Sequence, residues 1–216
     1  MRSETGPHRR RRMPRADRER QMMAVAEQVF AERGYVAASM DEIAERVGVS
    51  KPMLYEYFRS KEGLLVACIR QARAELLQVT SQAAVQADTP EEMLRQGLIA
   101  YFRFVTEHRQ AWALLRSEAA VVGPSAAAEI EAVRQQQTDL ISGTMSLYAP
   151  EPSPLATAPA AEVIVGGCER LALWCERNPD VTPEQAAELV MQLIWFGIAA
   201  VVPEAAQPGQ PSPGRG

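Results

Sequence analysis

The 216-residue sequence is poor in the side chains from which disulfide frameworks and metal sites are built. It has three cysteines (Cys68, Cys168 and Cys175), two histidines and no Cys-x-x-Cys pair. An odd number of widely spaced cysteines is not the pattern of a disulfide scaffold, and a tetrahedral zinc site would need four grouped ligands. We therefore expect no metal site, and we expect the cysteines to lie as small apolar side chains in the core of a protein in a reducing cytoplasm.

Long apolar segments and the motifs of common enzyme classes are also lacking. No uncharged apolar run reaches 18 residues and no secretory signal is recognisable, so we expect a cytoplasmic protein that does not enter a membrane. No Gly-rich phosphate loop follows a strand pattern, and no nucleophile and base stand at a recognisable spacing. The sequence therefore predicts a protein that is not an enzyme and that needs no cofactor.

Charge of both signs is present, but it is unevenly distributed. The formal net charge is −4, yet residues 1–65 carry 13 Lys and Arg against 10 Asp and Glu, whereas residues 66–216 carry 10 against 17. This asymmetry suits an N-terminal unit that neutralises phosphates, followed by an acidic body that does not bind nucleic acid.

The most informative stretch, residues 39–61, predicts two short helices joined by a tight turn. Ser39 is a capping residue, Glu42 stands three positions later, and Gly48 lies where the first helix must end because glycine enters positive φ without strain. The apolar residues of this first helix recur at helical spacing and form one stripe that packs inward. They are Met40, Ile43, Ala44 and Val47.

The second helix follows Ser50, which we expect to cap it, and it carries Pro52 in its first turn, where proline is tolerated. Leu54 and Phe58 lie four positions apart and face the core. The remaining surface is expected to meet a DNA groove, as in helix-turn-helix proteins. It is formed by Lys51, Met53, Tyr55, Glu56 and Tyr57.

Ser60 predicts the start of a third helix, and Lys61 in its first turn opposes the helix dipole. A bound phosphate at this position would remove that conflict.

These residues resemble the DNA-binding domain of the tetracycline-repressor (TetR) family of regulators, over roughly residues 15–75. The departures from the common pattern are Pro52, where glycine is frequent, and Tyr57, where histidine is frequent. The segments that carry the resemblance are Gly34-Tyr35, Ser39 before Ile43-Ala44, Gly48-Val49-Ser50, Leu54-Tyr55, Tyr57-Phe58, and Lys61 before Leu64-Leu65.

The resemblance implies a set of DNA contacts. Phosphates would be held by Ser39, Tyr55, Tyr57 and Lys61, while base edges or thymine methyls would be approached by Lys51, Pro52, Met53 and Glu56. Met40 belongs both to the apolar stripe and to the predicted DNA-binding set. Each residue also has a simpler interpretation: the tyrosines as half-buried aromatics, the serines as caps only, and Lys61 as a solvated lysine. Their joint spacing favours DNA binding.

A run of arginines precedes the first helix, between Gly6-Pro7 and Pro14. It predicts a flexible basic arm over residues 1–14, in which Arg10, Arg11 and Arg12 either enter a minor groove or only keep the chain soluble.

The rest of the chain repeats the helical period, so the fold class is all-α. Residues 76–202 resemble the helical effector-binding and dimerisation domain of the same family in architecture, and residues 203–216 are expected to form a disordered tail. The prolines of residues 150–159 predict a loop. The expected helices are 16–33, 61–86, one opening at Thr89-Pro90, 109–120, 125–147, 160–177 and 183–201.

Aromatic and sulfur side chains of this second domain are candidates for an apolar cavity that holds a lipophilic or aromatic effector, although each taken singly is also compatible with ordinary core. The class of effector stays open, since Glu107, Glu118, Asp139 and Glu169 are alternatives that would pair with a cation. The predicted lining residues are Tyr101, Phe102, Phe104, Trp112, Met145, Tyr148, Cys168 and Trp174.

The helix at 183–201 is apolar on nearly every side, which indicates that a second subunit covers part of it. The alternative is a monomer with a central buried helix. The predicted interface residues are Gly166, Gly167, Leu171, Leu189, Leu193, Phe196 and Gly197.

These features favour a homodimeric transcriptional repressor that binds a palindromic DNA operator and is released by a small effector. Two alternatives remain: a regulator of the same fold that has no effector or that activates, and a helical carrier or enzyme with a vestigial helix-turn-helix.

Overall fold

The computed structural model describes residues 13–116, 122–148 and 154–199, and these residues form helices with no strand among them. The predicted contacts of Arg10, Arg11 and Arg12 and the predicted tail at 203–216 lie outside the described residues. The helices are α1 (Arg15–Ala37), α2 (Met40–Val47), α3 (Lys51–Phe58), α4 (Lys61–Val85), α5 (Pro90–Glu107), α6 (Arg109–Leu115), α8 (Pro124–Tyr148), α9 (Pro154–Glu176) and α10 (Pro183–Ala199). The all-α fold class is confirmed.

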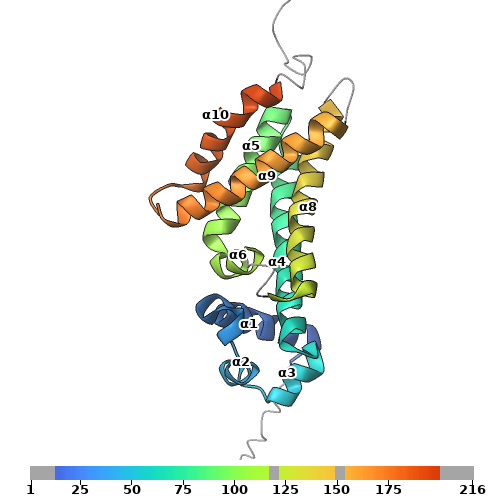
Figure 1. Ribbon diagram of the computed structural model, residues 1–216, viewed down its shortest axis with the longest axis vertical. Helices are drawn as coiled ribbons and strands as arrows, with labels where there is room; N and C mark the ends of the chain where they lie inside the picture. Colours follow the sequence, from blue (N-terminus) through green and yellow to red (C-terminus); the bar gives the residue numbers. More distant parts are fainter. Residues whose placement is uncertain (1–12, 117–121, 149–153, 200–216) are drawn as a thin grey trace, which may run out of the picture.

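Helix α4 connects two groups of helices (Figure 1). Helices α1, α2 and α3 gather at one end of the molecule, where α1 and α3 pack against α4. Further along α4, α5 and α8 pack against it, while α9 and α10 cover α8 and α5. A helix of 25 residues is about 37 Å long, so α4 belongs to both groups.

The predicted helix ends are confirmed where capping chemistry decides them. The side chains of Ser39, Ser60 and Thr89 each accept a backbone N–H three residues later. Gly48 adopts the left-handed conformation (φ 79°, ψ 34°). Ser50 occupies the N-cap position of α3, but its side chain makes no capping hydrogen bond, so that part of the prediction is wrong.

Two predicted boundaries differ from the structure. Helix α6 ends at Leu115 rather than near residue 120. Helix α9 begins at Pro154, so the proline-rich loop does not extend to Pro159, which lies inside the helix. Proline near a helix start removes few backbone hydrogen bonds, and the packing of α9 on α8 and α10 compensates for them.

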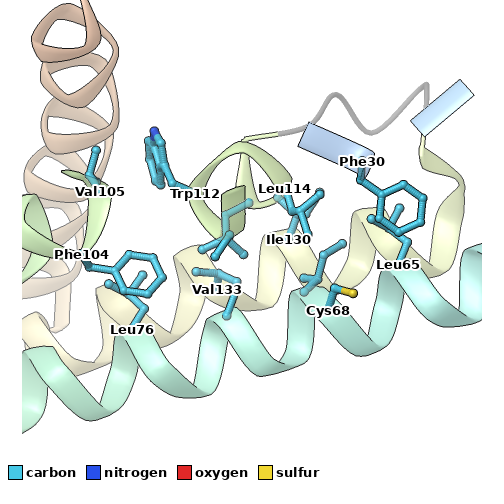
Figure 2. Packing of buried hydrophobic residues seen from close by; sticks show 14 of the residues in the cluster. Phe30, Leu65, Cys68, Leu76, Phe104, Val105, Trp112, Leu114, Ile130 and Val133 are labelled. Atoms are coloured by element: carbon cyan, nitrogen blue, oxygen red, sulfur yellow. The ribbon is translucent and has the colours of Figure 1, made fainter. Parts of the chain in front are cut away.

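One apolar core runs through both groups of helices. In Figure 2, Phe30 of α1 lies beside Leu65 of α4, and Leu114, Ile130 and Val133 continue the packing along α4. Cys68, Cys168 and Cys175 are buried and unpaired, as the sequence predicts. The two ends of the molecule are therefore joined by close-packed side chains, which transmit displacement rather than absorb it.

Candidate nucleic-acid interface and ligand cavity

The helix-turn-helix is built by the turn between α2 and α3. The N–H groups of Gly48 and Val49 both donate to the Ala44 carbonyl, at 3.0 Å each, which closes the end of α2 and reverses the chain. Leu54 and Phe58 of α3 are buried against the small core. The outer surface of α3 is thereby fixed relative to α1 and α2.

Four predicted DNA-contacting residues of α3, Lys51, Pro52, Tyr55 and Glu56, are exposed together on one surface. Lys51 donates to Asp41 at 2.8 Å, an exposed ion pair of small energetic value that a phosphate can replace.

Two further predicted contacts, Met53 and Tyr57, are half-buried and turn toward α1. Arg18 donates to the Met53 sulfur at 3.6 Å, and the Arg15 guanidinium lies 4.8 Å from the centre of the Tyr57 ring. The start of α1 and one side of α3 therefore share a hollow. The sequence interpretation missed Arg15 and Arg18 as cations beside the recognition helix, because the crossing of α1 over α3 is a tertiary feature.

The assignment of Met40 to the DNA-binding set is corrected by the structure. Its side chain is only 5% exposed and packs in the core with Ile43 and Val47. Ser39 is exposed, and its hydroxyl oxygen accepts the Glu42 N–H at 3.1 Å. A hydroxyl also has a proton to donate, so this cap leaves Ser39 able to meet a phosphate.

Lys61 has a structural partner that the sequence did not reveal. Its ammonium group donates to the carbonyl oxygens of Tyr35 at 2.9 Å, Ala38 at 3.0 Å and Val36 at 3.3 Å. It also lies 4.5 Å from the centre of the Tyr35 ring. The explanation of its position by a phosphate is therefore corrected, because the carbonyl oxygens at the end of α1 already serve as acceptors for the ammonium group.

The junction between α3 and α4 is tightly constrained. Arg59 has φ +69° and ψ −41°, and the Ser60 N–H donates to the Phe58 carbonyl at 2.8 Å across it, which makes a γ-turn of the strained type. A Cβ at Gly63 would come within 2.1 Å of the Phe58 oxygen. Among the described residues, Arg59 is exposed and has no ion-pair partner, so it is a further cation beside the recognition helix.

A cavity lies between α4, α5, α8 and α9. It is partly open to solvent, and apolar side chains form most of its wall. Five predicted residues line it: Tyr101, Trp112, Met145, Tyr148 and Cys168.

Three predicted lining residues lie elsewhere, which corrects their assignment. Phe102 and Phe104 are buried in the core, and Phe104 stacks on His108 with ring centres 4.9 Å apart. Trp174 is 40% exposed on the outer side of α9. Helical spacing shows which residues share a face, but the rotation of each helix decides which face meets the cavity.

The polar groups of the cavity wall fall into two kinds. Arg134 donates to Glu169 at 2.9 Å and to Glu131 at 3.2 Å, so its charge is already paired. The Tyr101 hydroxyl and the Gln137 amide nitrogen are buried and have no hydrogen-bond partner among the described residues. Burial raises the pKa of Tyr101 well above its usual value, and the neighbouring Cys168 and Glu169 raise it further. The phenol is therefore a neutral donor.

The outer faces of α9 and α10 carry exposed apolar side chains. On α9 these include Val163 (67% exposed) beside the exposed predicted interface residues Gly166 and Gly167. On α10, Leu189 is 41% and Leu193 84% exposed.

The remaining predicted interface residues are not seen on this exposed surface. Leu171 is half-buried and packs partly against the core of its own chain. The side chain of Phe196 and the surroundings of Gly197 lie outside the described residues.

Helix α8 joins the cavity to the DNA-reading end. Its start is held by Glu62 in the first turn of α4, whose carboxylate accepts the Ser125 N–H at 3.2 Å. Gly123 approaches this carboxylate so closely that a Cβ would lie 3.1 Å from it. Glu129 of α8 pairs with Arg70 at 2.7 Å and Arg73 at 3.0 Å. The same helix supplies much of the cavity wall farther along.

Comparison with known proteins agrees with this architecture. Residues 22–68 match the family model of bacterial regulatory proteins of the tetR family, and residues 90–197 match the tetracyclin repressor-like C-terminal domain. The chain is 30% identical over 196 residues to the HTH-type transcriptional activator FasR of Mycolicibacterium smegmatis, covering 91% of this chain and 90% of FasR.

Solved structures show the same fold. A TetR-like transcriptional regulator from Rhodococcus sp. RHA1 superposes with a TM-score of 0.73 at 31% identity, covering 87% of this chain and 99% of that one. The regulator FadR of Bacillus subtilis, solved with stearoyl-CoA, has a TM-score of 0.70 at 17% identity, covering 81% and 96%. The chain belongs to the TetR family of bacterial transcriptional regulators.

Proposed function

We propose that this TetR-family regulator acts as a homodimer that places the outer surface of α3 in successive major grooves of a palindromic operator. The observation that carries the proposal is the exposed group on α3, where Lys51, Tyr55 and Glu56 stand clear of the core. Arg15, Arg18 and the exposed Arg59 flank this group and supply cations for phosphates.

The dimer is supported by the apolar surface of α9 and α10. An exposed leucine such as Leu193 is stable on a surface when a partner covers it, and Gly166 and Gly167 allow two helices to approach closely. Leu193→Glu should produce monomers in analytical ultracentrifugation, because it places a charge in the interface. Leu147→Glu on α8 is the matched control: Leu147 is 78% exposed and outside this surface, so that variant should stay dimeric.

The cavity is proposed to hold a lipophilic effector. Its lining supports this, since apolar walls with a few placed polar groups are typical of small-molecule sites. That FadR was solved with stearoyl-CoA is compatible with it, although that protein shares only the fold. An effector that prefers the conformation with wrongly spaced recognition helices would release the DNA, and α4 and α8 are the elements that would carry the change.

The direct test is selection of bound duplexes from a random DNA library by the full-length protein at physiological salt. An enriched inverted repeat, whose half-sites are about one helical turn apart, is the expected result. Failure to enrich any sequence, from protein that is folded, would contradict operator binding.

We propose repression as the mode of action, because a DNA-bound dimer blocks the polymerase when its operator overlaps a promoter. The relative FasR is an activator, so activation is the second candidate. A reporter fused to the selected operator separates the two: deletion of the regulator raises expression under repression and lowers it under activation.

A further inference from the structure

We propose that the effector is a neutral lipophile with one hydrogen-bond acceptor, such as an ester or ketone carbonyl, which is received by the Tyr101 hydroxyl and the Gln137 amide. This inference rests on the proposed function, because it takes the cavity to be the effector site. The inference adds two requirements to the proposed function: the ligand must carry a hydrogen-bond acceptor, and it must carry no net charge.

The two unpartnered donors are the first observation. Tyr101 is 9% exposed and Gln137 is 7% exposed, and both line the cavity. Their hydroxyl and amide nitrogen have no hydrogen-bond partner among the described residues. A buried polar group without a hydrogen-bond partner is destabilising. A ligand that offers such a partner to these two groups would therefore be stabilised in the cavity. An amide nitrogen only donates, and a phenol donates readily. The occupant must therefore present an acceptor.

The remaining hydroxyl groups of the wall already have partners. Thr80 donates to the Leu76 carbonyl at 2.8 Å, and Thr144 donates to the Leu140 carbonyl at 2.9 Å, so both are used within their own helices. The Tyr148 hydroxyl lies 3.3 Å from the Met93 sulfur. Recognition of a polar group is thereby concentrated on Tyr101 and Gln137 rather than spread over the cavity.

The charges of the wall disfavour an anion. Arg134 is the only cation that lines the cavity within the described ranges. Its guanidinium group already donates to Glu169 and to Glu131. A carboxylate entering the cavity would lose its hydration, would find no free cation, and would meet Glu169 as a like charge. A cationic ligand would gain little binding energy from Glu169, because that carboxylate is already paired with Arg134. A neutral acceptor avoids both penalties.

The arrangement also places the acceptor. Tyr101 belongs to α5, whereas Arg134 and Gln137 are one turn apart on α8. The phenol lies within electrostatic reach of Arg134, Glu169 and Cys168. Tyr101 therefore faces the part of α8 that carries Arg134, and Gln137 lines the cavity one turn farther along that helix. The apolar residues around Leu94, Ile141 and Trp195 are left for the body of the ligand.

The test compares two ligands with the same chain length, methyl decanoate and decanoate, by isothermal titration calorimetry at pH 7.5. The full-length protein is compared with Tyr101→Phe and Gln137→Leu, each of which removes one donor and keeps a similar shape. Tyr148→Phe is the matched control, because it makes the same substitution in the same cavity at a hydroxyl that already has a contact. Thermal melts of each variant without ligand verify folding.

We expect methyl decanoate to bind the unmodified protein at least about tenfold more tightly than decanoate. Loss of one donor should weaken ester binding by about 3- to 10-fold, and Tyr148→Phe should change it by less than about twofold. Without ligand, Tyr101→Phe and Gln137→Leu should be as stable as the unmodified protein or more stable, since each removes an unsatisfied buried group.

Each contrary result has a distinct meaning. Equal binding of the acid and the ester, or ester affinity that is unchanged in both donor variants, overturns the neutral-acceptor inference while the effector site stands. Failure of both ligands to bind overturns the inference and the proposed effector site together. Operator selection is independent of all three results and tests DNA recognition alone.

Discussion

Replacing Lys61 with methionine should destabilise the DNA-binding end of the molecule rather than remove a phosphate contact. Methionine keeps much of the length of the side chain and removes the ammonium group. The carbonyls of Tyr35, Val36 and Ala38 then lose a charged donor at 2.9, 3.3 and 3.0 Å, and the Tyr35 ring loses a cation 4.5 Å from its centre.

The expected magnitude follows from those contacts. The bonds to Tyr35 and Ala38 are part-buried and that to Val36 is exposed, so water replaces the last one readily. Two part-buried bonds at about 0.5–1.5 kcal/mol each, with a cation–π contact of about 0.5 kcal/mol, give about 1.5–3.5 kcal/mol. For a chain of 216 residues this lowers Tm by about 3–14 °C.

The assay combines melts followed by circular dichroism with operator affinity measured over a range of salt concentrations. If Lys61 acts through the α1 carbonyls, Tm falls and the salt slope of the folded protein is unchanged. If instead it holds a phosphate, Tm is unchanged and the slope falls by about 0.9. Lys51→Met is the control for stability: the pair that Lys51 makes with Asp41 is exposed, so the Tm of this variant should hardly change. An unaltered Tm for Lys61→Met would refute the structural role.

Three further outcomes are expected. Burial beside Glu75 raises the pKa of Glu27 to about 7, so the folded state retains a proton that the unfolded chain releases. Stability should therefore fall by about 1–2 kcal/mol from pH 5.5 to 7.5, and urea titrations of Glu27→Gln should lack this fall; an equal fall in the variant would assign it to another group. Arg59→Gly should raise the free energy of unfolding by about 0.5–1 kcal/mol, because glycine accepts φ +69° without strain, whereas Arg59→Ala should give no gain; destabilisation by glycine would contradict the strain argument. Glu62→Ala removes the acceptor for the Ser125 N–H and so loosens the contact between α4 and α8. It should reduce the factor by which methyl decanoate lowers operator affinity; an unchanged factor would show that the ligand acts on the DNA-binding end through other contacts.

Local chemistry made most of the fold predictable. Helix caps such as Ser39 and Thr89 act within four residues, and so do chain reversals at glycines such as Gly48. Their effect can therefore be predicted from the sequence. The 3.6-residue period identified the buried faces of α2 and α3 in the same way. Prediction failed at Pro159, where packing by distant helices outweighs the local preference of proline.

The DNA-reading surface was predictable in part. Residues exposed on α3, such as Tyr55 and Glu56, follow from the period of one short helix. Met40 was placed wrongly in that set because it lies on the buried stripe of α2. The roles of Arg15 and Lys61 depend on α1 lying beside α3 and α4, and no local pattern encodes that crossing.

The sequence by itself determined an all-helical chain with a capped helix-turn-helix near its beginning, because caps, turns and periodicity are short-range properties. Tertiary structure alone decided which aromatic residues face the cavity, since Tyr101 and Phe102 are neighbours in the chain yet only Tyr101 lines it. It also decided that the Tyr101 hydroxyl and the Gln137 amide nitrogen find no hydrogen-bond partner among the described residues. The rotation and crossing of helices are set by packing among residues far apart in the chain, and that long-range fit is what the sequence pattern does not show.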